Sequence, residues 1–117
     1  MSDIYTIEFE PSKLSYQQEE LGMRFGDLDT AVELMKKEEK MIIAELTVYY
    51  SRKGGYKNMT ELNGLIYSDA KFKDYFDRYE RTLKERNRSK IRFESFKAFR
   101  DDLRTKVVNE RELAKHL

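Results

Sequence analysis

Residues 14–49, LSYQQEELGMRFGDLDTAVELMKKEEKMIIAELTVY, decide the fold of this chain of 117 residues. Stepping through them at a mean spacing of about 3.5 residues meets apolar side chains at nine of eleven positions, as expected for a helix with one buried seam. The two polar exceptions are Gln18 and Glu39. The full set of seam positions is Leu14, Gln18, Leu21, Phe25, Leu28, Val32, Met35, Glu39, Ile42, Leu46 and Tyr49.

Two interpretations of this first helical segment, residues 13–53, stay open. Gly22 and Gly26 lower the helix propensity of its first half. The segment is therefore either one helix of about 39 residues, or a short helix that bends near Gly26 before a firm helix to about Arg52. Gly54-Gly55 then ends the helix, because glycine readily adopts the left-handed conformation that follows a helix C-terminus.

A second long helix is expected over residues 70–115, because no Pro or Gly interrupts them. The connection before it, residues 54–69, contains a short helix with Thr60 as its N-cap, and Ser68-Asp69 caps the long helix. The stripe of the long helix is apolar at both ends and polar in the middle. Its positions are Phe72, Phe76, Tyr79, Leu83, Arg86, Lys90, Phe93, Phe96, Arg100, Leu103 and Val107.

Two long helices joined by a short connection predict an all-α fold, a long antiparallel and coiled-coil-like helical hairpin in one domain. We expect residues 1–12 to form an extended N-terminal segment with a possible short strand, because Tyr5, Ile7 and Phe9 alternate at a spacing of two. The aromatic side chains of the two stripes exceed what one hairpin can cover. We therefore expect a homodimer or a higher homo-oligomer.

The composition excludes several classes of function. The chain has no cysteine, which excludes a disulfide scaffold, a thiolate zinc site and a thiol nucleophile, and its one histidine is His116. No nucleotide-binding glycine loop, zinc-protease or serine-hydrolase motif is present. We therefore expect no cofactor, no bound metal and no enzyme activity. No apolar run approaches about 18 residues and the acidic N-terminus does not resemble a signal peptide, so a cytoplasmic protein without membrane contact is expected.

The charge differs between the two halves of the chain. Residues 1–70 carry 8 Lys and Arg against 13 Asp and Glu, and residues 71–117 carry 15 against 9. The net charges are therefore −5 and +6, which sum to the +1 of the whole chain. Packing of the halves on each other, or on a second copy, accounts for this division. A basic second half is also suited to binding phosphates.

The basic residues of the second helix are candidate contacts for nucleic acid or for a partner protein, because guanidinium groups hold phosphates well. Aromatic side chains beside them can stack on bases, unless they belong to the buried seam. The competing interpretation is that these cations pair with the acidic first helix, with Glu39 near Arg86 or Lys90. The candidates are Lys84, Arg86, Arg88, Lys90, Arg92, Lys97, Arg100 and Arg104.

The loop after the first helix, with its flanks, is a second candidate contact. Tyrosine supplies rigid contact area with a polar end, and the neighbouring cations add charge. The alternative is an ordinary exposed turn in which the glycines only end the helix. The candidate residues are Tyr50, Arg52, Lys53, Tyr56 and Lys57.

At residues 92–105, RFESFKAFRDDLRT, and at residues 59–63, MTELN, the chain resembles small helical-hairpin phage proteins. The resemblance covers roughly residues 27–108. It implies an association with phage recombination and single-strand-binding functions, and it brings no catalytic residues. The matching positions in the second helix are Phe93, Glu94, Lys97, Ala98, Phe99, Arg104 and Thr105.

The residues and the resemblance together predict a non-enzymatic, oligomeric accessory protein of phage type. It would contact nucleic acid or a DNA-metabolism partner through the basic helix and the loop. The alternative is a protein-binding inhibitor or adaptor that acts on a host protein without touching nucleic acid. In a phage-encoded protein either function would operate in the cytoplasm of the host cell.

Overall fold

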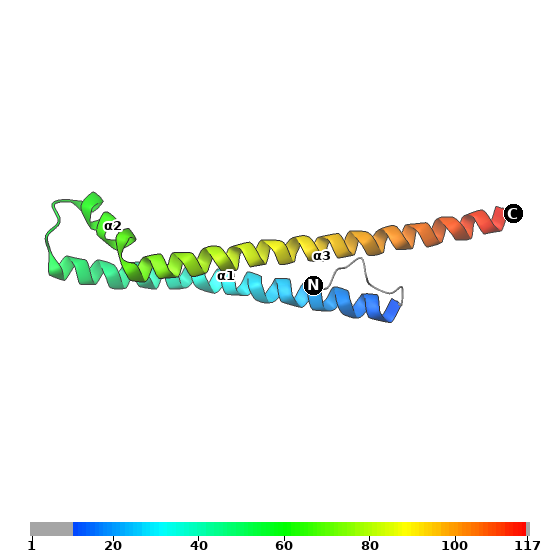
Figure 1. Ribbon diagram of the computed structural model, residues 1–117, viewed down its shortest axis with the longest axis horizontal. Coiled ribbons are helices and arrows are strands. Elements are labelled where there is room, and N and C mark those ends of the chain that lie inside the picture. The colour runs from blue at the N-terminus through cyan, green and yellow to red at the C-terminus, as the bar shows by residue number, and fades with distance from the viewer. Residues whose placement is uncertain (1–10, 117) are drawn as a thin grey trace. The chain divides into compact units, whose positions relative to one another are not determined.

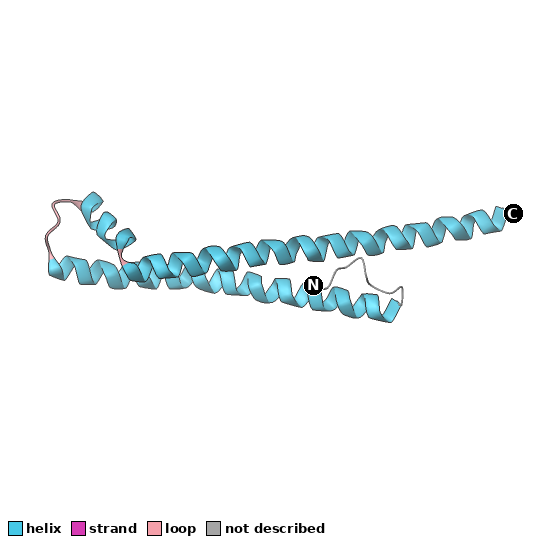
Figure 2. Cartoon of the chain, in the orientation of Figure 1, coloured by secondary structure: helices cyan, strands magenta, loops and turns pink. Residues whose placement is uncertain are grey.

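A computed structural model describes residues 11–116 of the chain as three α-helices. Helix α1 runs over Pro11–Lys53, α2 over Met59–Ser68 and α3 over Ala70–His116 (Figure 1). The rest of this range is loop, and no strand occurs in it (Figure 2). The predicted all-α helical hairpin is confirmed. The strand expected near the N-terminus falls on residues 1–10, which lie outside the described range.

Helix α1 is continuous through Gly22 and Gly26, which agrees with the single-helix interpretation. It begins at Pro11, two residues before the predicted start. Proline suits the first position of a helix, because its fixed φ is helical and its missing N–H would have no partner there.

The connection between the long helices follows the predicted order, with one corrected cap. Gly54 and Gly55 have φ of 74° and 89°, a backbone conformation that side chains with a Cβ rarely adopt, and they end α1. The N-cap of α2 is Asn58, not Thr60: the Asn58 side chain accepts a hydrogen bond from the N–H of Glu61 at 2.9 Å. The Glu61 carboxylate in turn accepts from the N–H of Lys57 at 2.7 Å. Two polar side chains therefore satisfy the start of α2.

The described chain forms two compact units, and in each a segment of α1 packs antiparallel against a segment of α3. The middle unit comprises residues 28–86 and includes α2; the terminal unit comprises residues 11–27 and 87–116. The core of the middle unit joins all three helices. Its buried side chains are Ile42, Leu46, Leu62, Ile66, Phe72 and Tyr75.

The terminal unit has a smaller aromatic core. Leu14 of α1 and Phe96 of α3 are buried, and Phe96 has no exposed surface. The rings of Phe25 and Phe93 lie 6.3 Å apart between their centroids, across the two helices. These contacts pair the start of α1 with the second half of α3.

The seam of α3 differs from the predicted one at three positions, Phe76, Lys90 and Val107, and Val107 is 44% exposed. Tyr75 and Ser89 are buried, with 1% and 3% of their surfaces exposed, whereas Phe76 is 45% exposed and Lys90 is exposed. The Tyr75 hydroxyl donates a hydrogen bond to the main-chain oxygen of Met35 at 2.6 Å, so the tyrosine reaches its polar partner from inside the core. A spacing of 3.5 residues allows a step of three or four at each turn, and the predicted stripe took the wrong step after Phe72.

Candidate functional site

The structure divides the eight basic residues predicted on α3 into two groups. Arg86 and Arg100 are half-buried and face α1, while the other six are exposed. Lys84 belongs to the middle unit. The exposed residues of the terminal unit form the surface we call the basic surface. Its members are Arg88, Lys90, Arg92, Lys97 and Arg104.

Arg86 is engaged within the middle unit. Its Nη1 lies 3.8 Å from Oδ1 of Asp29 on α1, and Nε is buried and makes no hydrogen bond with the described residues. The expected pairing of Arg86 with Glu39 does not form within one chain, because Glu39 lies ten residues further along α1 than Asp29, about 15 Å of helix. The same pairing across a dimer stays a prediction. The neighbouring Glu38 instead pairs with Arg78, whose Nη2 lies 2.8 Å from Glu38 Oε1.

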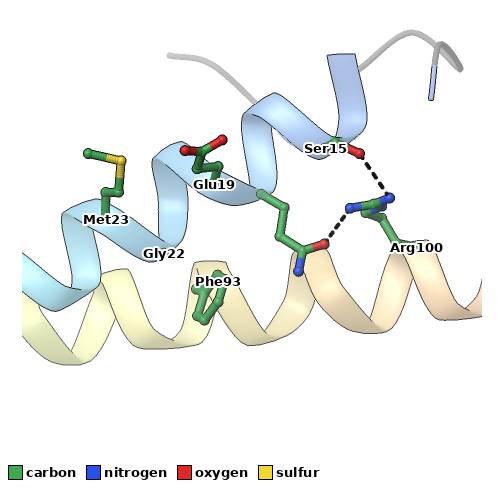
Figure 3. Close-up of a pocket in the computed structure, with 7 residues that line it drawn as sticks. Ser15, Glu19, Gly22, Met23, Phe93 and Arg100 are labelled. Atoms are coloured by element: carbon green, nitrogen blue, oxygen red, sulfur yellow. Dashed lines mark hydrogen bonds between the residues drawn. The ribbon is translucent and has the colours of Figure 1, made fainter. Parts of the chain in front are cut away.

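Arg100 closes the terminal unit against the start of α1. Its Nη1 donates to Oε1 of Gln18 at 2.6 Å and its Nη2 to Oγ of Ser15 at 3.4 Å, as Figure 3 shows. Both Gln18 and Arg100 occupy seam positions, so the two polar interruptions satisfy each other. The two hydrogen bonds of Arg100 lie at the edge of a shallow groove of about 420 Å³. The groove is lined by Ser15, Gln18, Glu19, Gly22, Met23, Phe93 and Arg100.

Phe93 lies between the two helices and is not presented to solvent as a stacking platform. On one side Gly22 approaches it so closely that an added Cβ would lie 3.1 Å from its Cε1. Lys97 Nζ lies 4.6 Å from the ring centroid, within the range of a cation–π contact. Phe96 is fully buried. For these two rings, the structure supports the core interpretation over base stacking.

The basic surface carries charge that no described carboxylate neutralises. Across residues 11–116, none of its five members has a carboxylate oxygen within ion-pair distance. Lys90, Lys97 and Arg104 recur every seven residues and therefore lie along one side of α3, whereas Arg88 and Arg92 are one turn apart on another side. Ile91, 63% exposed, sits among them. Such a surface can hold several anionic groups along a helix.

The loop residues are also divided between internal and external roles. Tyr50 and Tyr56 pack against the core of the middle unit, and the hydroxyl of Tyr50 donates to Oδ2 of Asp69 at 2.6 Å. Arg52, Lys53 and Lys57 are exposed. The two tyrosines therefore stabilise the fold, and only the three cations are left for a contact.

The Tyr50–Asp69 hydrogen bond shifts the acidity of both groups. The pKa of Asp69 is lowered, first by this bond and then by the N–H of Lys71, which donates to Oδ1 at 2.8 Å. The pKa of Tyr50 is raised, chiefly because its hydroxyl donates to the Asp69 carboxylate. Asp69 therefore acts as the expected cap of α3 in its charged form.

The described residues contain neither a metal-binding cluster nor a membrane span. No group of three or more His, Asp or Glu side chains between residues 11 and 116 is arranged to hold a metal ion. None of the three helices is long and apolar enough to cross a bilayer. The arrangement that remains on the described surface is a set of exposed cations on α3.

Four residues that contact the side chains of Arg86, Phe93 and Arg100 were not predicted as site residues: Ser15, Gln18, Gly22 and Asp29. Gln18 had a signal in the sequence, since a polar residue in an apolar seam needs a polar partner on the facing helix. Comparison of the chain with protein-family models, with curated proteins and with solved structures finds no match.

Proposed function

We propose that this protein is a non-enzymatic accessory protein that self-associates and binds a nucleic acid through the basic surface of α3. The observation that carries the proposal is the set of five exposed cations that no described carboxylate neutralises. A helix that carries cations on two sides within a few turns can neutralise phosphates on each of those sides.

Ion pairs between described residues involve other cations of the chain but none of the five cations of the basic surface. In the middle unit four of the five carboxylates of α1 already have cationic partners, and Glu39 is the exception: Asp29 pairs with Arg86, Glu33 with Lys36, Glu38 with Arg78 and Glu45 with Lys71. In the terminal unit α1 offers Glu19, Glu20 and Asp27, and none of them forms an ion pair with a described cation of α3. Within residues 11–116, therefore, no carboxylate competes with an external anion for the basic surface.

DNA is the nucleic acid to test first. The resemblance to helical-hairpin phage proteins motivates this choice, because it implies an association with recombination and single-strand binding. Single-stranded and duplex DNA carry the same phosphates at different linear density, and so they differ in the salt dependence of binding.

The test is a salt titration of DNA binding, followed by fluorescence anisotropy with labelled oligonucleotides. Three or four phosphate contacts predict that the logarithm of the affinity falls with the logarithm of salt at a slope of about −2 to −4. Replacing Arg88 and Arg92 with Gln removes two contacts, so the slope should flatten by about 1.4 on single strands and about 1.8 on duplex. Gln is a comparable helix former, so helicity should not change.

A matched control has the same change in net charge. The double variant Lys36→Gln/Lys71→Gln removes two cations that already pair with carboxylates, and its DNA affinity and slope should equal those of the unaltered protein. Equal losses in both double variants would show that only net charge matters. No binding at about 50 mM salt, where phosphate contacts are strong, would rule out the nucleic-acid function.

A protein-binding adaptor is the second candidate function, favoured by an exposed aromatic patch in the middle unit. Tyr67 of α2 is 51% exposed and Phe76 of α3 is 45% exposed, and both rings contact Phe72. Large apolar side chains in a polar surround are typical of protein interfaces. A partner that co-purifies from host cells after nuclease treatment, and is lost in Tyr67→Ser, would support this function.

A further inference from the structure

Three large apolar side chains of α1 in the middle unit point away from the core. Leu34, Met41 and Val48 are 58%, 64% and 50% exposed, although methionine, leucine and valine are among the residues most often buried. They recur every seven residues. At 3.6 residues per turn they therefore form one stripe, on a side of α1 well away from its buried Val32 and Leu46.

Four further positions, most of them with small side chains, complete a heptad pattern with these three apolar residues. Thr30, Lys37, Ala44 and Ser51 precede or follow the apolar residues by three or four positions, and all four are exposed. Three of them are small, which allows a second helix to approach closely. A repeat of seven residues that continues over three heptads is the geometry of a two-helix coiled coil rather than of a single solvated helix.

We infer that this stripe, Leu34-Met41-Val48, binds the same stripe of a second copy of the chain, with the two α1 helices antiparallel about Met41. The inference identifies the surface for the self-association in the proposed function and is independent of nucleic-acid binding. About a two-fold axis at Met41, Leu34 of one copy meets Val48 of the other, because both are seven residues from the axis.

Charge selects the antiparallel arrangement over the parallel one. In a parallel pair each Lys37 faces the Lys37 of the other copy inside the seam, where like charges repel. In the antiparallel pair Lys37 lies beside Glu45 of the other copy, since each is four residues from Met41. Glu45 already binds Lys71 of its own chain and still has a side chain that is 56% exposed, so it can accept a second cation.

The size of the stripe sets the strength of the association. Residues 30–51 span about 33 Å of helix with a diameter of about 10–12 Å, a footprint of roughly 350–400 Å² per copy. The two footprints together fall below the roughly 1,200 Å² of a standard stable interface. The dimer is therefore in equilibrium with the monomer, and concentration is the variable to scan.

Sedimentation equilibrium from about 10 to 500 µM tests the inference, because weak interfaces of this class dissociate in that range. The full chain should change from monomer to dimer, and Met41→Glu should raise the dissociation constant by roughly tenfold or more, since it places two carboxylates on the axis. Ile91→Glu is the matched control, because Ile91 is 63% exposed and lies off the stripe; its dissociation constant should be unchanged.

A charge exchange tests the direction of pairing. Lys37→Glu should weaken the antiparallel dimer, and the double variant Lys37→Glu/Glu45→Lys should restore it. Circular dichroism confirms that each variant is as helical as the unaltered chain. A monomer throughout the concentration range, or a dimer that Met41→Glu leaves intact, overturns the interface. Failure of the double variant to restore the dimer overturns the antiparallel pairing. DNA binding without self-association would sink this inference alone.

Discussion

Gly22 and Gly26 lie one turn apart on α1, but their surroundings differ. A Cβ added to Gly22 would lie 3.1 and 3.2 Å from two atoms of the Phe93 ring, whereas a Cβ added to Gly26 would meet no atom within 4 Å. The Phe93 ring has limited freedom to retreat, because Lys97 packs over it. Close packing therefore favours glycine at position 22, where a Cβ would require the Phe93 ring to shift by a few tenths of an ångström, whereas no contact favours glycine at position 26.

Alanine substitutions should separate the two positions. Gly26→Ala should raise the free energy of unfolding by about 1 kcal/mol, the difference in helix propensity between the residues. Gly22→Ala has the same gain in propensity but must displace Phe93, and overpacking of this kind costs about 1–3 kcal/mol. We therefore expect Gly22→Ala to be the less stable variant by about that amount in urea unfolding followed by circular dichroism. Equal gains would mean that the ring moves without strain.

At the scale of the helices, the pattern of apolar residues predicted the existence and extent of the helices better than it predicted their caps and seams. The two long helices, the glycine stop and the cap of α3 at Asp69 were all readable, because each has a strong local signal. The N-cap of α2 was misplaced at Thr60, since Asn58 and Thr60 are both good caps and Glu61 supports either. The structure selects Asn58, because its side chain accepts a hydrogen bond from the N–H of Glu61, and the Glu61 carboxylate accepts one from the N–H of Lys57.

The seam of α3 shows why a correct period does not give a correct register. Between Lys84 and Lys90 no apolar residue marks the buried side. The structure places Ser89 there, with 3% of its surface exposed, and Lys90 in solvent. A small side chain can be buried at lower cost than an ammonium group, which must keep its hydration. That comparison, rather than strict stepping by 3.5 residues, identifies the correct register.

The start of α3 should depend on pH through Asp69. Because its pKa is lowered in the folded state, the stabilisation it contributes is fully present above the ordinary aspartate pKa of about 3.9, and it is lost as the pH falls through the lower folded value. Tyr50→Phe removes the largest cause of the shift. The pKa of Asp69 should therefore rise toward its ordinary value but stay below it, because the N–H of Lys71 still donates.

Carboxyl carbon NMR titration of Asp69 measures this change directly. Thr60→Ser, at an exposed position of α2, is a control that should leave the titration unchanged. An Asp69 pKa that is the same with and without the Tyr50 hydroxyl would show that the hydrogen bond does not form in solution.

At the scale of the whole molecule, the sequence predicted which side chains are basic but not which of them face solvent. Arg86 and Arg100 were grouped with the exposed cations, although both occupy seam positions and turn toward α1. Their partners, Asp29 and Gln18, come from a helix about 60–80 residues earlier in the chain, and such pairings depend on the register between helices. Only the structure supplies that register, so the basic surface could be predicted as a region but not residue by residue.

The two compact units also differ in how much apolar surface they bury. The middle unit has a core of six buried residues drawn from three helices, whereas Leu14 and Phe96 are the buried hydrophobic residues described in the terminal unit. Residues 104–116 of α3 are exposed throughout. Local stability follows the density of buried apolar contacts, so the units should not be equally stable.

Native-state hydrogen exchange should show this difference. Amides near Leu46 and Ile66 should exchange most slowly, those near Leu14 and Phe96 faster, and those of residues 104–116 fastest. Phe96→Ala removes a fully buried ring, which typically costs about 3–5 kcal/mol. Exchange near Leu14 should therefore accelerate at least about a hundredfold, since each 1.4 kcal/mol is about a factor of ten, while exchange near Leu46 and Ile66 should hardly change. An equal acceleration at all of these amides would show that the two units unfold together as one cooperative structure.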